Sequence, residues 1–376
     1  TLLVCCAVTA WLALVPVERW LRNRALAQPN ARSGHIVPTP QGAGIVVIPV
    51  ALIGAGVGLS LVPVSSSLLL HALGLAGACL LLLCVGLVDD RGSLSIGPRL
   101  VAQLAAAVLV VGTLPDDFHL SSLPPIAERA LLVLSIVWFV NLTNFMDGMD
   151  WLAASETVAI CVGVIGIALL GGTPAWLGLV AAAGCGATIG FMPANAPVAR
   201  LFLGDAGSLP LGLLICTLLL HLAAAGHVVA ALLLPLYFLV DATVTLLLRI
   251  VRREPFWQPH RQHAYQRALA RGLTVWRVLG TVALTNVVLV GLAVGTVIQP
   301  QPKLAIVAAA LGMAAVGLLL TFLAGALPWR RASAQVISRP GQSRESRNSD
   351  DVNPAWSDIK QMRVEERTDN VLGDKN

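Results

Sequence analysis

Long apolar stretches separated by short polar loops dominate the pattern along this 376-residue chain. Most of them are close to the 20 or so residues that an α-helix needs to cross the hydrocarbon core of a bilayer. We therefore predict about eleven membrane-spanning helices, with the runs near 99–114 and 155–171 as the shortest. The predicted runs cover residues 1–18, 44–63, 67–88, 99–114, 124–141, 155–171, 174–192, 209–225, 227–249, 278–298 and 304–326.

Composition supports an integral membrane protein. Hydrophobic residues make up 56% of the chain and charged residues only 12%, and the mean hydropathy of +0.79 lies far outside the range of soluble domains. The fold class predicted is all-α, a polytopic transmembrane bundle over residues 1–331. Residues 332–376 are rich in Ser, Asn, Asp, Glu and Arg with little apolar content, which predicts a disordered tail.

Basic residues alternate between the loops and indicate the topology. Loops on one side hold nearly all of the arginines, whereas the opposite loops hold only Arg129 and Lys303. The positive-inside rule then predicts an outside N-terminus and a cytoplasmic C-terminus. Arginines also follow the first run, which we interpret as a retained helix and not a signal peptide. The excess of basic residues is therefore explained by the membrane topology, and we expect no nucleic-acid partner.

Carboxylates gather at the predicted cytoplasmic ends of four different helices, where charge is costly and suggests a functional site. Grouped carboxylates repel each other and take up protons unless a cation neutralises them. Mg²⁺, or Mn²⁺, is the natural partner for oxygen ligands and often bridges protein carboxylates to substrate phosphates. The pattern therefore points to phosphate chemistry at the membrane surface. The carboxylates are those of Asp89, Asp90, Asp147, Asp150 and Asp205.

Simpler interpretations of each motif stay open. Adjacent aspartates often cap a helix or lie in solvent, and a GDAGS segment is commonly a turn. His260 and His263 share a helix face but supply only half of a zinc shell. Gly148 predicts a helix end, which would leave Asn144 and Asp147 on one face of the last turn.

Asp241 is a separate case. It precedes Arg249 by eight residues, so it lies about 12 Å into its predicted helix from the loop. Such an aspartate either forms a structural hydrogen bond with a neighbouring helix or helps to hold the site. The arginines and histidines of 249–277 provide donors for an anionic substrate.

Five motifs in order, PNARSGHIVPTPQGAG, VDDRGSLS, NLTNFMDGMD, NAPVARLFLGDAGS and HRQHAYQR, resemble the polyprenyl-phosphate N-acetylhexosamine-1-phosphate transferases (glycosyltransferase family 4). That family includes phospho-MurNAc-pentapeptide translocase and the enzymes that initiate O-antigen synthesis. The resemblance covers about residues 28–268 and excludes the tail. It implies a multi-pass protein of the bacterial inner membrane, with an active site facing the cytoplasm, and is compatible with a homodimer.

The resemblance also implies a reaction. A polyprenyl phosphate attacks the β-phosphate of a UDP-N-acetyl sugar, UMP leaves, and a lipid-linked sugar pyrophosphate remains, with Mg²⁺ required. By the family pattern, Asp89 and Asp90 lie near the lipid phosphate and the metal, and Asp205 is a metal ligand. Asp147 is expected to be catalytic on the nucleotide side. The expected substrate-binding residues are Asn144, Asp150, Arg32, His35, His260, Arg261 and His263.

Departures from the family pattern bear on the sugar. The translocase branch carries a lysine in its first loop, whereas this loop offers Arg32 and His35, which disfavours the muramoyl-pentapeptide donor. Gln41 stands where an arginine is common in the O-antigen branch, and Trp151 stands where a glycine is usual. The segment HRQHAYQR is most similar to O-antigen initiators that use FucNAc or QuiNAc.

Two other functions compete with the transferase. A proton-coupled transporter would also carry intramembrane carboxylates, but carriers hold their sites near the midplane and often show repeats between halves. No repeat is visible here, and the ionisable residues lie mainly on one side. A catalytically silent relative is the second rival, suggested by Gln41 and Trp151. Release of UMP from a UDP-sugar and a polyprenyl phosphate would separate these cases.

Overall fold

The computed structural model describes residues 1–22, 26–27, 38–92, 94–115, 117–120, 123–255 and 260–325, so Arg32, His35 and the predicted tail lie outside these residues. The described ranges form thirteen helices and two short strands. The helices are α1 Leu2–Leu21, α2 Gly44–Ser60, α3 Ser66–Gly92, α4 Ile96–Gly112, α5 Pro125–Met146, α6 Leu152–Leu169, α7 Ala175–Phe191, α8 Asp205–Ala224, α9 Val228–Leu233, α10 Leu236–Val251, α11 Ala264–Ala270, α12 Val275–Ile298 and α13 Pro302–Ala324. The strands are β1 Leu26–Ala27 and β2 Thr39–Pro40.

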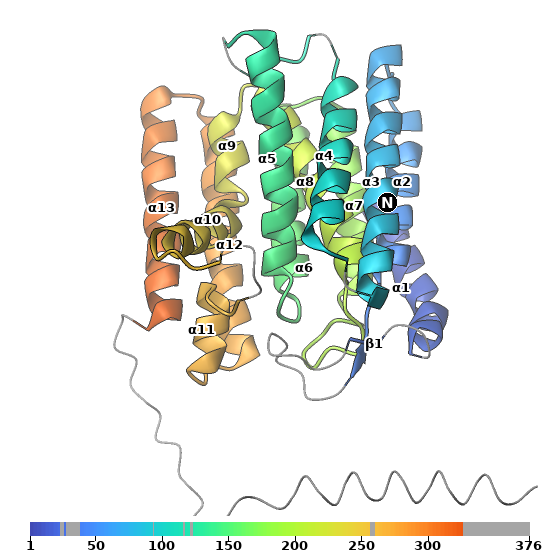
Figure 1. Ribbon diagram of the computed structural model, residues 1–376. Helices are drawn as coiled ribbons and strands as arrows, with labels where there is room; N and C mark the ends of the chain where they lie inside the picture. The colour runs from blue at the N-terminus through green and yellow to red at the C-terminus, as the bar shows by residue number, and fades with distance from the viewer. Residues whose placement is uncertain are drawn as a thin grey trace, which may run out of the picture. The chain divides into compact units, whose positions relative to one another are not determined.

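The prediction of a polytopic helical bundle is confirmed. Among the described residues, seven helices are long and apolar enough to cross a membrane, namely α1, α3, α5, α6, α8, α12 and α13. Helices α2, α4 and α7 are apolar as well, but each has 17 residues and spans about 25 Å. Most helices run along one common direction (Figure 1). The direction in which the chain crosses the membrane stays a prediction.

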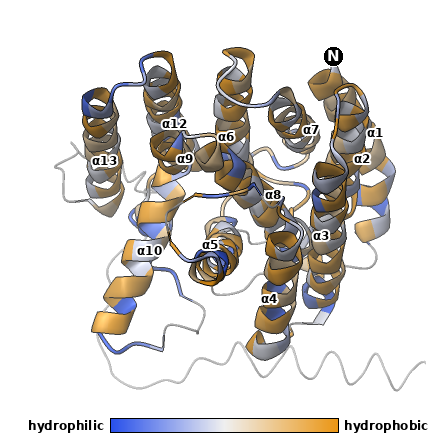
Figure 2. Ribbon diagram, turned by 90° about the horizontal axis from the view of Figure 1, so that it is seen from above, coloured by the Kyte–Doolittle hydropathy of each residue, from blue (hydrophilic) through white to orange (hydrophobic). Residues whose placement is uncertain are grey.

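The expectation of one continuous helix over 227–249 is wrong. This run forms two helices, α9 and α10, which are separated at Leu234 and Pro235. Proline has no backbone N–H and clashes with the preceding turn, so it interrupts the helical hydrogen bonds at this point. Helix α10 is seen nearly end-on in Figure 1 and lengthwise in Figure 2, whereas α5 shows the reverse. Helix α10 therefore runs across the direction of the bundle.

Helix α8 forms the centre of the bundle. It is the most buried of the candidate spans, with 83% of its apolar window inside the protein. It packs against α2, α3, α5, α6, α7 and α9. Because α8 begins at Asp205, the fold places this carboxylate where the ends of several helices meet.

Two short strands add to the all-α fold that the sequence predicts. Strand β1 pairs with β2 in antiparallel fashion, with Leu26 opposite Pro40. Gln41 then forms an isolated bridge with Phe202, just before α8 begins. Strand β1 and helix α11 lie at the lower end of the bundle in Figure 1. These contacts fix the segment that precedes α2 against the segment that precedes α8.

Candidate functional site

The Asp90 side chain joins the end of α3 to the start of α8. Its Oδ1 accepts the backbone N–H of Asp205 at 2.9 Å, and its Oδ2 accepts that of Ala206 at 3.2 Å. The first N–H groups of a helix have no intrahelical partner, and the positive end of the helix dipole favours a carboxylate there. Gln41 donates to the backbone oxygen of Asp90 at 2.6 Å. Asp90 thus caps a helix, and metal binding through its remaining lone pairs stays a prediction.

Arg99 in the first turn of α4 lies between the predicted carboxylates. Its guanidinium is 2.8 Å from Asp89 Oδ2 and 3.1 Å from Asp205 Oδ2. It also donates to Asn144 Oδ1 at 3.1 Å. The distribution of arginines among the loops identifies Arg99 only as a topological charge. The signal that could have identified it is its place inside an apolar helix, where a cation needs anionic partners.

The amide of Asn144 completes this cluster from α5. Its Nδ2 donates to Asp205 Oδ1 at 2.6 Å and to Ser208 Oγ at 2.9 Å. Asp89 also accepts the backbone N–H of Leu94 at 2.6 Å. The structure therefore brings together residues from α3, α4, α5 and α8. Asp89, Asn144 and Asp205 were predicted for the site, whereas Arg99 and Ser208 are additions.

Asp147 follows the last residue of α5 at the edge of the same cluster. Burial raises the pKa of its carboxyl group well above the usual range, and the nearby carboxylates of Asp205, Asp90 and Asp150 raise it further. A carboxyl group in these surroundings takes up a proton or a cation. The place of Asp147 is therefore compatible with the expected role beside a metal or a substrate.

Helix α5 ends at Met146, which confirms the helix end predicted near Gly148. The Tyr265 hydroxyl donates to the backbone oxygen of Phe145 at 3.2 Å. A side-chain Cβ at Gly148 would overlap this hydroxyl. A larger residue at this position would displace Tyr265, so glycine favours its close approach to the end of α5.

Asp150 and Trp151 hold the segment between α7 and α8. The carboxylate of Asp150, which is buried, accepts the backbone N–H of Ala199 at 3.0 Å. Trp151 has a positive φ of 63°; its backbone N–H donates to Asn195 and its indole N–H to the backbone oxygen of Met192. The structure places Asp150 in a structural contact, and its role in substrate binding stays a prediction.

Asp241 anchors the histidine segment. It is 3% exposed within α10 and accepts the backbone N–H of Ala264, the first residue of α11, at 3.0 Å. His263 Nδ1 lies 3.6 Å from the same carboxylate. Of the two interpretations left open for Asp241, the structure shows the hydrogen bond to a neighbouring helix, since Ala264 is the first residue of α11. The same bond holds the segment that carries the histidines.

The histidine segment packs against the end of α5. The ring of His263 stacks with those of Phe145 and Tyr265, at centroid distances of 6.3 and 6.1 Å. The expectation that His260 and His263 share a helix face is wrong, because both precede α11, which begins at Ala264. Their ring centroids are nevertheless 4.9 Å apart, and Arg261 is exposed between them in sequence. The segment HRQHAYQR therefore lies beside the segment NLTNFMDGMD at the end of α5.

Two arginines expected to serve as donors for an anion have structural partners instead. Arg249 is 4% exposed, donates to the backbone oxygen of Pro255 at 2.7 Å and lies 3.2 Å from Glu254. Arg271 donates to the backbone oxygen of Leu323 at 2.7 Å, at the end of α13. Neither guanidinium is directed at the Asp205 cluster. Each one forms hydrogen bonds or an ion pair with acceptors close to its own helix end.

The cluster contains carboxylates, the ligand type that a hard divalent cation prefers. Among the residues described, no group of three His, Cys, Asp or Glu side chains is placed to hold a metal ion, so Mg²⁺ stays a prediction. However, the Arg99 guanidinium lies between Asp89 and Asp205, so positive charge is stabilised between these oxygens. Carboxylate oxygens are the ligands that Mg²⁺ prefers.

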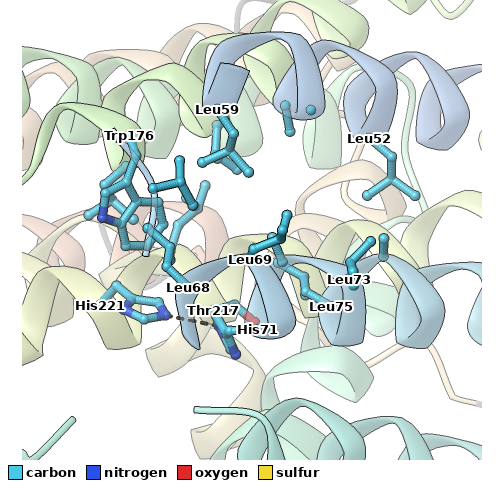
Figure 3. A pocket seen from close by; sticks show the side chains of 18 of the residues that line it. Leu52, Leu59, Leu68, Leu69, His71, Leu73, Leu75, Trp176, Thr217 and His221 are labelled. Carbon is cyan, nitrogen blue, oxygen red and sulfur yellow. Dashed lines mark hydrogen bonds between the residues drawn. The ribbon is translucent and has the colours of Figure 1, made fainter. Parts of the chain in front are cut away.

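An apolar cavity of about 470 Å³ lies between α2, α3, α7 and α8, away from this cluster. Figure 3 shows its leucines and Trp176, with the His71 and His221 side chains joined by a hydrogen bond of 3.0 Å. Leu75 in its lining precedes Asp90 by fifteen residues on α3, which corresponds to about 22 Å. The cavity is therefore separate from the cluster of carboxylates.

Comparison with known proteins agrees with the site. Residues 72–223 match glycosyl transferase family 4. The decaprenyl-phosphate N-acetylglucosaminephosphotransferase of Mycobacterium tuberculosis H37Rv is 30% identical over 362 residues, covering 84% of this chain and 87% of the relative. A probable undecaprenyl-phosphate N-acetylglucosaminyl 1-phosphate transferase of Bacillus subtilis is 29% identical, covering 70% of this chain and 75% of the relative.

A third relative belongs to another branch. The phospho-N-acetylmuramoyl-pentapeptide-transferase of Acaryochloris marina is 32% identical over 227 residues, which cover 53% of this chain and 57% of the relative. The matched regions include the Asp89, Arg99, Asn144 and Asp205 cluster within residues 72–223. On these grounds, the chain belongs to glycosyl transferase family 4.

Proposed function

We propose that this protein transfers an N-acetylhexosamine-1-phosphate from a UDP-sugar to a polyprenyl phosphate such as undecaprenyl phosphate, releasing UMP. The observation that carries the proposal is the contact of Arg99 with Asp89, Asp205 and Asn144 at one end of a membrane bundle. Two of the relatives are named for transfers of this kind. Phosphoryl transfer needs positioned reactants and charge stabilisation more than covalent help from the protein, and this cluster supplies both.

Asp89 is suited to act on the lipid phosphate. Its carboxylate is held on one side by the backbone N–H of Leu94 and on the other by Arg99. A carboxylate fixed in this way can orient the attacking phosphate or accept its proton. Arg99 can then stabilise the negative charge that develops on the pyrophosphate, because a guanidinium forms paired hydrogen bonds with phosphate oxygens.

Asn144 and Asp147 lie at the end of α5, which the histidine segment contacts through Tyr265 and His263. We assign this side of the cluster to the UDP-sugar, with His260, Arg261 and His263 as donors to its pyrophosphate and sugar. Asp205 and Asp90 would hold Mg²⁺. The ion would neutralise charge on the two phosphates as the bond to UMP breaks. Tyr265 fixes the end of α5 so that Asn144 and Asp147 keep their positions.

The identity of the sugar on the UDP donor is a separate proposal. We infer a UDP-N-acetylhexosamine, with UDP-N-acetylglucosamine as the first to test because two relatives are named for this sugar. We further propose that the lipid-linked product starts a cell-surface polysaccharide of the O-antigen type. The site would face the cytoplasm from the inner membrane, with the N-terminus outside, since nearly all loop arginines lie on that side.

The test is UMP release by the protein purified in detergent, with polyprenyl phosphate and a panel of UDP-N-acetyl sugars. We expect Asp147→Asn to raise the KM for the UDP-sugar, or to abolish activity, while the KM for polyprenyl phosphate changes less than about threefold. Asp89→Asn should lower kcat with every donor. A silent Asp89→Asn, or an effect of Asp147→Asn on the lipid KM alone, would show that the two sides are wrongly assigned.

The metal is tested in the same assay. Asp205→Asn should abolish turnover while the variant remains monodisperse, and excess EDTA should do the same to the unmodified protein. Recovery on addition of Mg²⁺ or Mn²⁺ would identify the ion. Full turnover in EDTA would remove the metal from the mechanism, and no UMP with any donor would favour a silent relative or a transporter.

A further inference from the structure

Glu156 is a buried carboxylate that the proposed reaction does not use. Glu156 lies in α6 and is 1% exposed. Asn286 of α12 donates to its Oε2 at 2.7 Å, whereas Glu156 Oε1 and Asn286 Oδ1 have no hydrogen-bond partner. No basic side chain forms an ion pair with Glu156 among the described residues. An ionisable group inside a membrane bundle is costly and indicates a function.

Glu156 lies at the start of the displaced helix α10. Its carboxyl group interacts with the backbone N–H of Phe238, the third residue of that helix. The break at Pro235 creates a helix start within the bundle, where the first N–H groups have no intrahelical partner and cannot reach water. The positive end of the α10 dipole also favours a carboxylate at this point. Glu156 therefore stabilises the break that lets α10 cross the bundle.

Helix α10 leads from Glu156 toward the histidine segment. Tyr237 is fully buried next to Phe238, and its hydroxyl has no hydrogen-bond partner among the described residues. Tyr237 and Asp241 are four residues apart, so they lie on one face of α10. Asp241 in turn holds the first residue of α11, Ala264. Helix α10 thus connects Phe238, which faces Glu156, with Asp241 and the start of α11.

Helix α11 makes the last connection to the cluster. Tyr265, its second residue, donates to the backbone oxygen of Phe145 near the end of α5. Phe145 stands between Asn144 and Asp147 in the chain. The position of α11, and with it that of His263, therefore depends on where α10 begins.

We propose that Glu156 is a positioning residue for the UDP-sugar side of the site. It touches none of the proposed reacting groups, and it acts by fixing the start and direction of α10, which carries Asp241 and the histidine segment. The proposal rests on the proposed function for its kinetic consequence. Its structural consequence, the order of residues 263–270, does not depend on any reaction.

The variants follow from the hydrogen bonds. Glu156→Leu removes both carboxyl oxygens. The Asn286 amide then loses its acceptor, and the Phe238 N–H loses the carboxyl group that it faces, which is costly for buried groups. Glu156→Gln keeps one acceptor oxygen, and its new N–H₂ group can donate to Asn286 Oδ1. Glu128→Leu is the control, because Glu128 is buried in α5 but contacts Leu120, away from α10.

Hydrogen exchange of the detergent-solubilised protein is the first readout. We expect faster exchange at residues 263–270 in Glu156→Leu, and unmodified rates there in Glu156→Gln and Glu128→Leu. Unchanged exchange at 263–270 in Glu156→Leu would overturn the proposal. An equal increase in α1 and α2, which do not pack closely against α10 or α11, would also overturn it, since it would show a general loss of packing.

Two-substrate kinetics is the second readout. We expect Glu156→Leu to raise the KM for the UDP-sugar by at least about tenfold, with the KM for polyprenyl phosphate within about threefold of the unmodified value. Glu156→Gln should restore both. Equal effects of Leu and Gln, or an effect on the lipid KM alone, would overturn the positioning role. If the unmodified protein releases no UMP while exchange still responds to Glu156→Leu, only the proposed function has failed.

Discussion

The backbone N–H of Asp205 donates to the Asp90 carboxylate at 2.9 Å and joins two motifs that are 115 residues apart. Two glycines allow this contact. A Cβ at Gly204 would overlap the Asp90 carboxylate, and a Cβ at Gly86 would overlap the backbone between Asp205 and Ala206. Helices α3 and α8 can therefore approach closely enough for the Asp90 carboxylate of α3 to cap the N-terminus of α8.

Gly86 provides a test of this close approach. Gly86→Ala should force α3 away from the start of α8, break the Asp90 cap and lower stability by about 1–3 kcal/mol, the usual cost of overpacking. We also expect UMP release to fall by about tenfold or more, because Asp205 moves with the backbone. Gly92→Ala is the control in the same helix, since a Cβ there meets open space. Equal melting temperatures and activities in both variants would contradict the structural role of Gly86.

Hydropathy was sufficient to predict the bundle, because lipid-facing and buried helices are both apolar over their length. It did not predict the break in 227–249, since Pro235 and its neighbours are as apolar as the rest of the run. It also did not predict α11, which has only seven residues. This helix is held by the contacts of Ala264 with Asp241 and of Tyr265 with Phe145, which join residues far apart in sequence and leave no trace in hydropathy.

The residue types of the site were readable from the motifs, but their partners were not. Asp89, Asn144 and Asp205 lie in one cluster, as the sequence analysis expected. Arg99 was missed because loop arginines were assigned to topology, and only the fold shows that α4 places its guanidinium between two carboxylates. Conversely, Arg249 was expected to meet substrate and instead holds Pro255 and Glu254, since a buried guanidinium needs nearby acceptors.

Arg99 should be essential for turnover. Arg99→Gln removes the cation that contacts Asp89 and Asp205, and the loss of one electrostatic stabiliser in an active site lowers kcat by about 100-fold to 1000-fold. Arg99→Lys should recover only part of the loss, because an ammonium cannot bridge two carboxylates and an amide as a planar guanidinium does. Arg91→Gln is the control, since Arg91 is exposed at the end of α3. Steady-state UMP release by Arg99→Gln within twofold of the Arg91→Gln value would exclude Arg99 from the mechanism.

The raised pKa of Asp147 predicts how stability depends on pH. Below about pH 4, the usual pKa of an aspartate, Asp147 is protonated in both the folded and the unfolded chain. As the pH rises, the unfolded chain loses this proton first, so the free energy of unfolding falls until the raised pKa of the folded state is reached. Asp147→Asn should therefore be more stable than the unmodified protein in EDTA, by a margin that grows with pH from about 4 upward.

Melting temperatures measured in EDTA across this pH window check the prediction for Asp147. Asp117→Asn controls for the loss of one carboxylate, because Asp117 lies in the loop between α4 and α5 and is exposed. A margin that stays constant, or that shrinks as the pH rises, would mean that the folded protein does not raise the pKa of Asp147.

Trp151 offers a test of backbone strain next to the site. Its φ of 63° lies in the left-handed region, which costs residues other than glycine about 1–2 kcal/mol. The indole N–H bond to Met192 and the edge contact with the Trp276 ring, at 5.5 Å between centroids, offset this cost. Trp151→Gly and Trp151→Ala both lose the indole, so their difference isolates the backbone. We expect the glycine variant to be more stable than the alanine variant by about 1 kcal/mol.

At an ordinary position within a helix the order is reversed, because glycine costs about 0.5–1 kcal/mol relative to alanine. Ala159→Gly, in the interior of α6, should therefore lower the melting temperature. The opposite signs at Trp151 and Ala159 are the diagnostic result, and thermal unfolding of the four proteins in one detergent measures them. If Trp151→Ala were the more stable of the two Trp151 variants, the left-handed conformation would not be retained there. Asn195 would then have lost the backbone N–H that joins the start of α6 to the segment before α8.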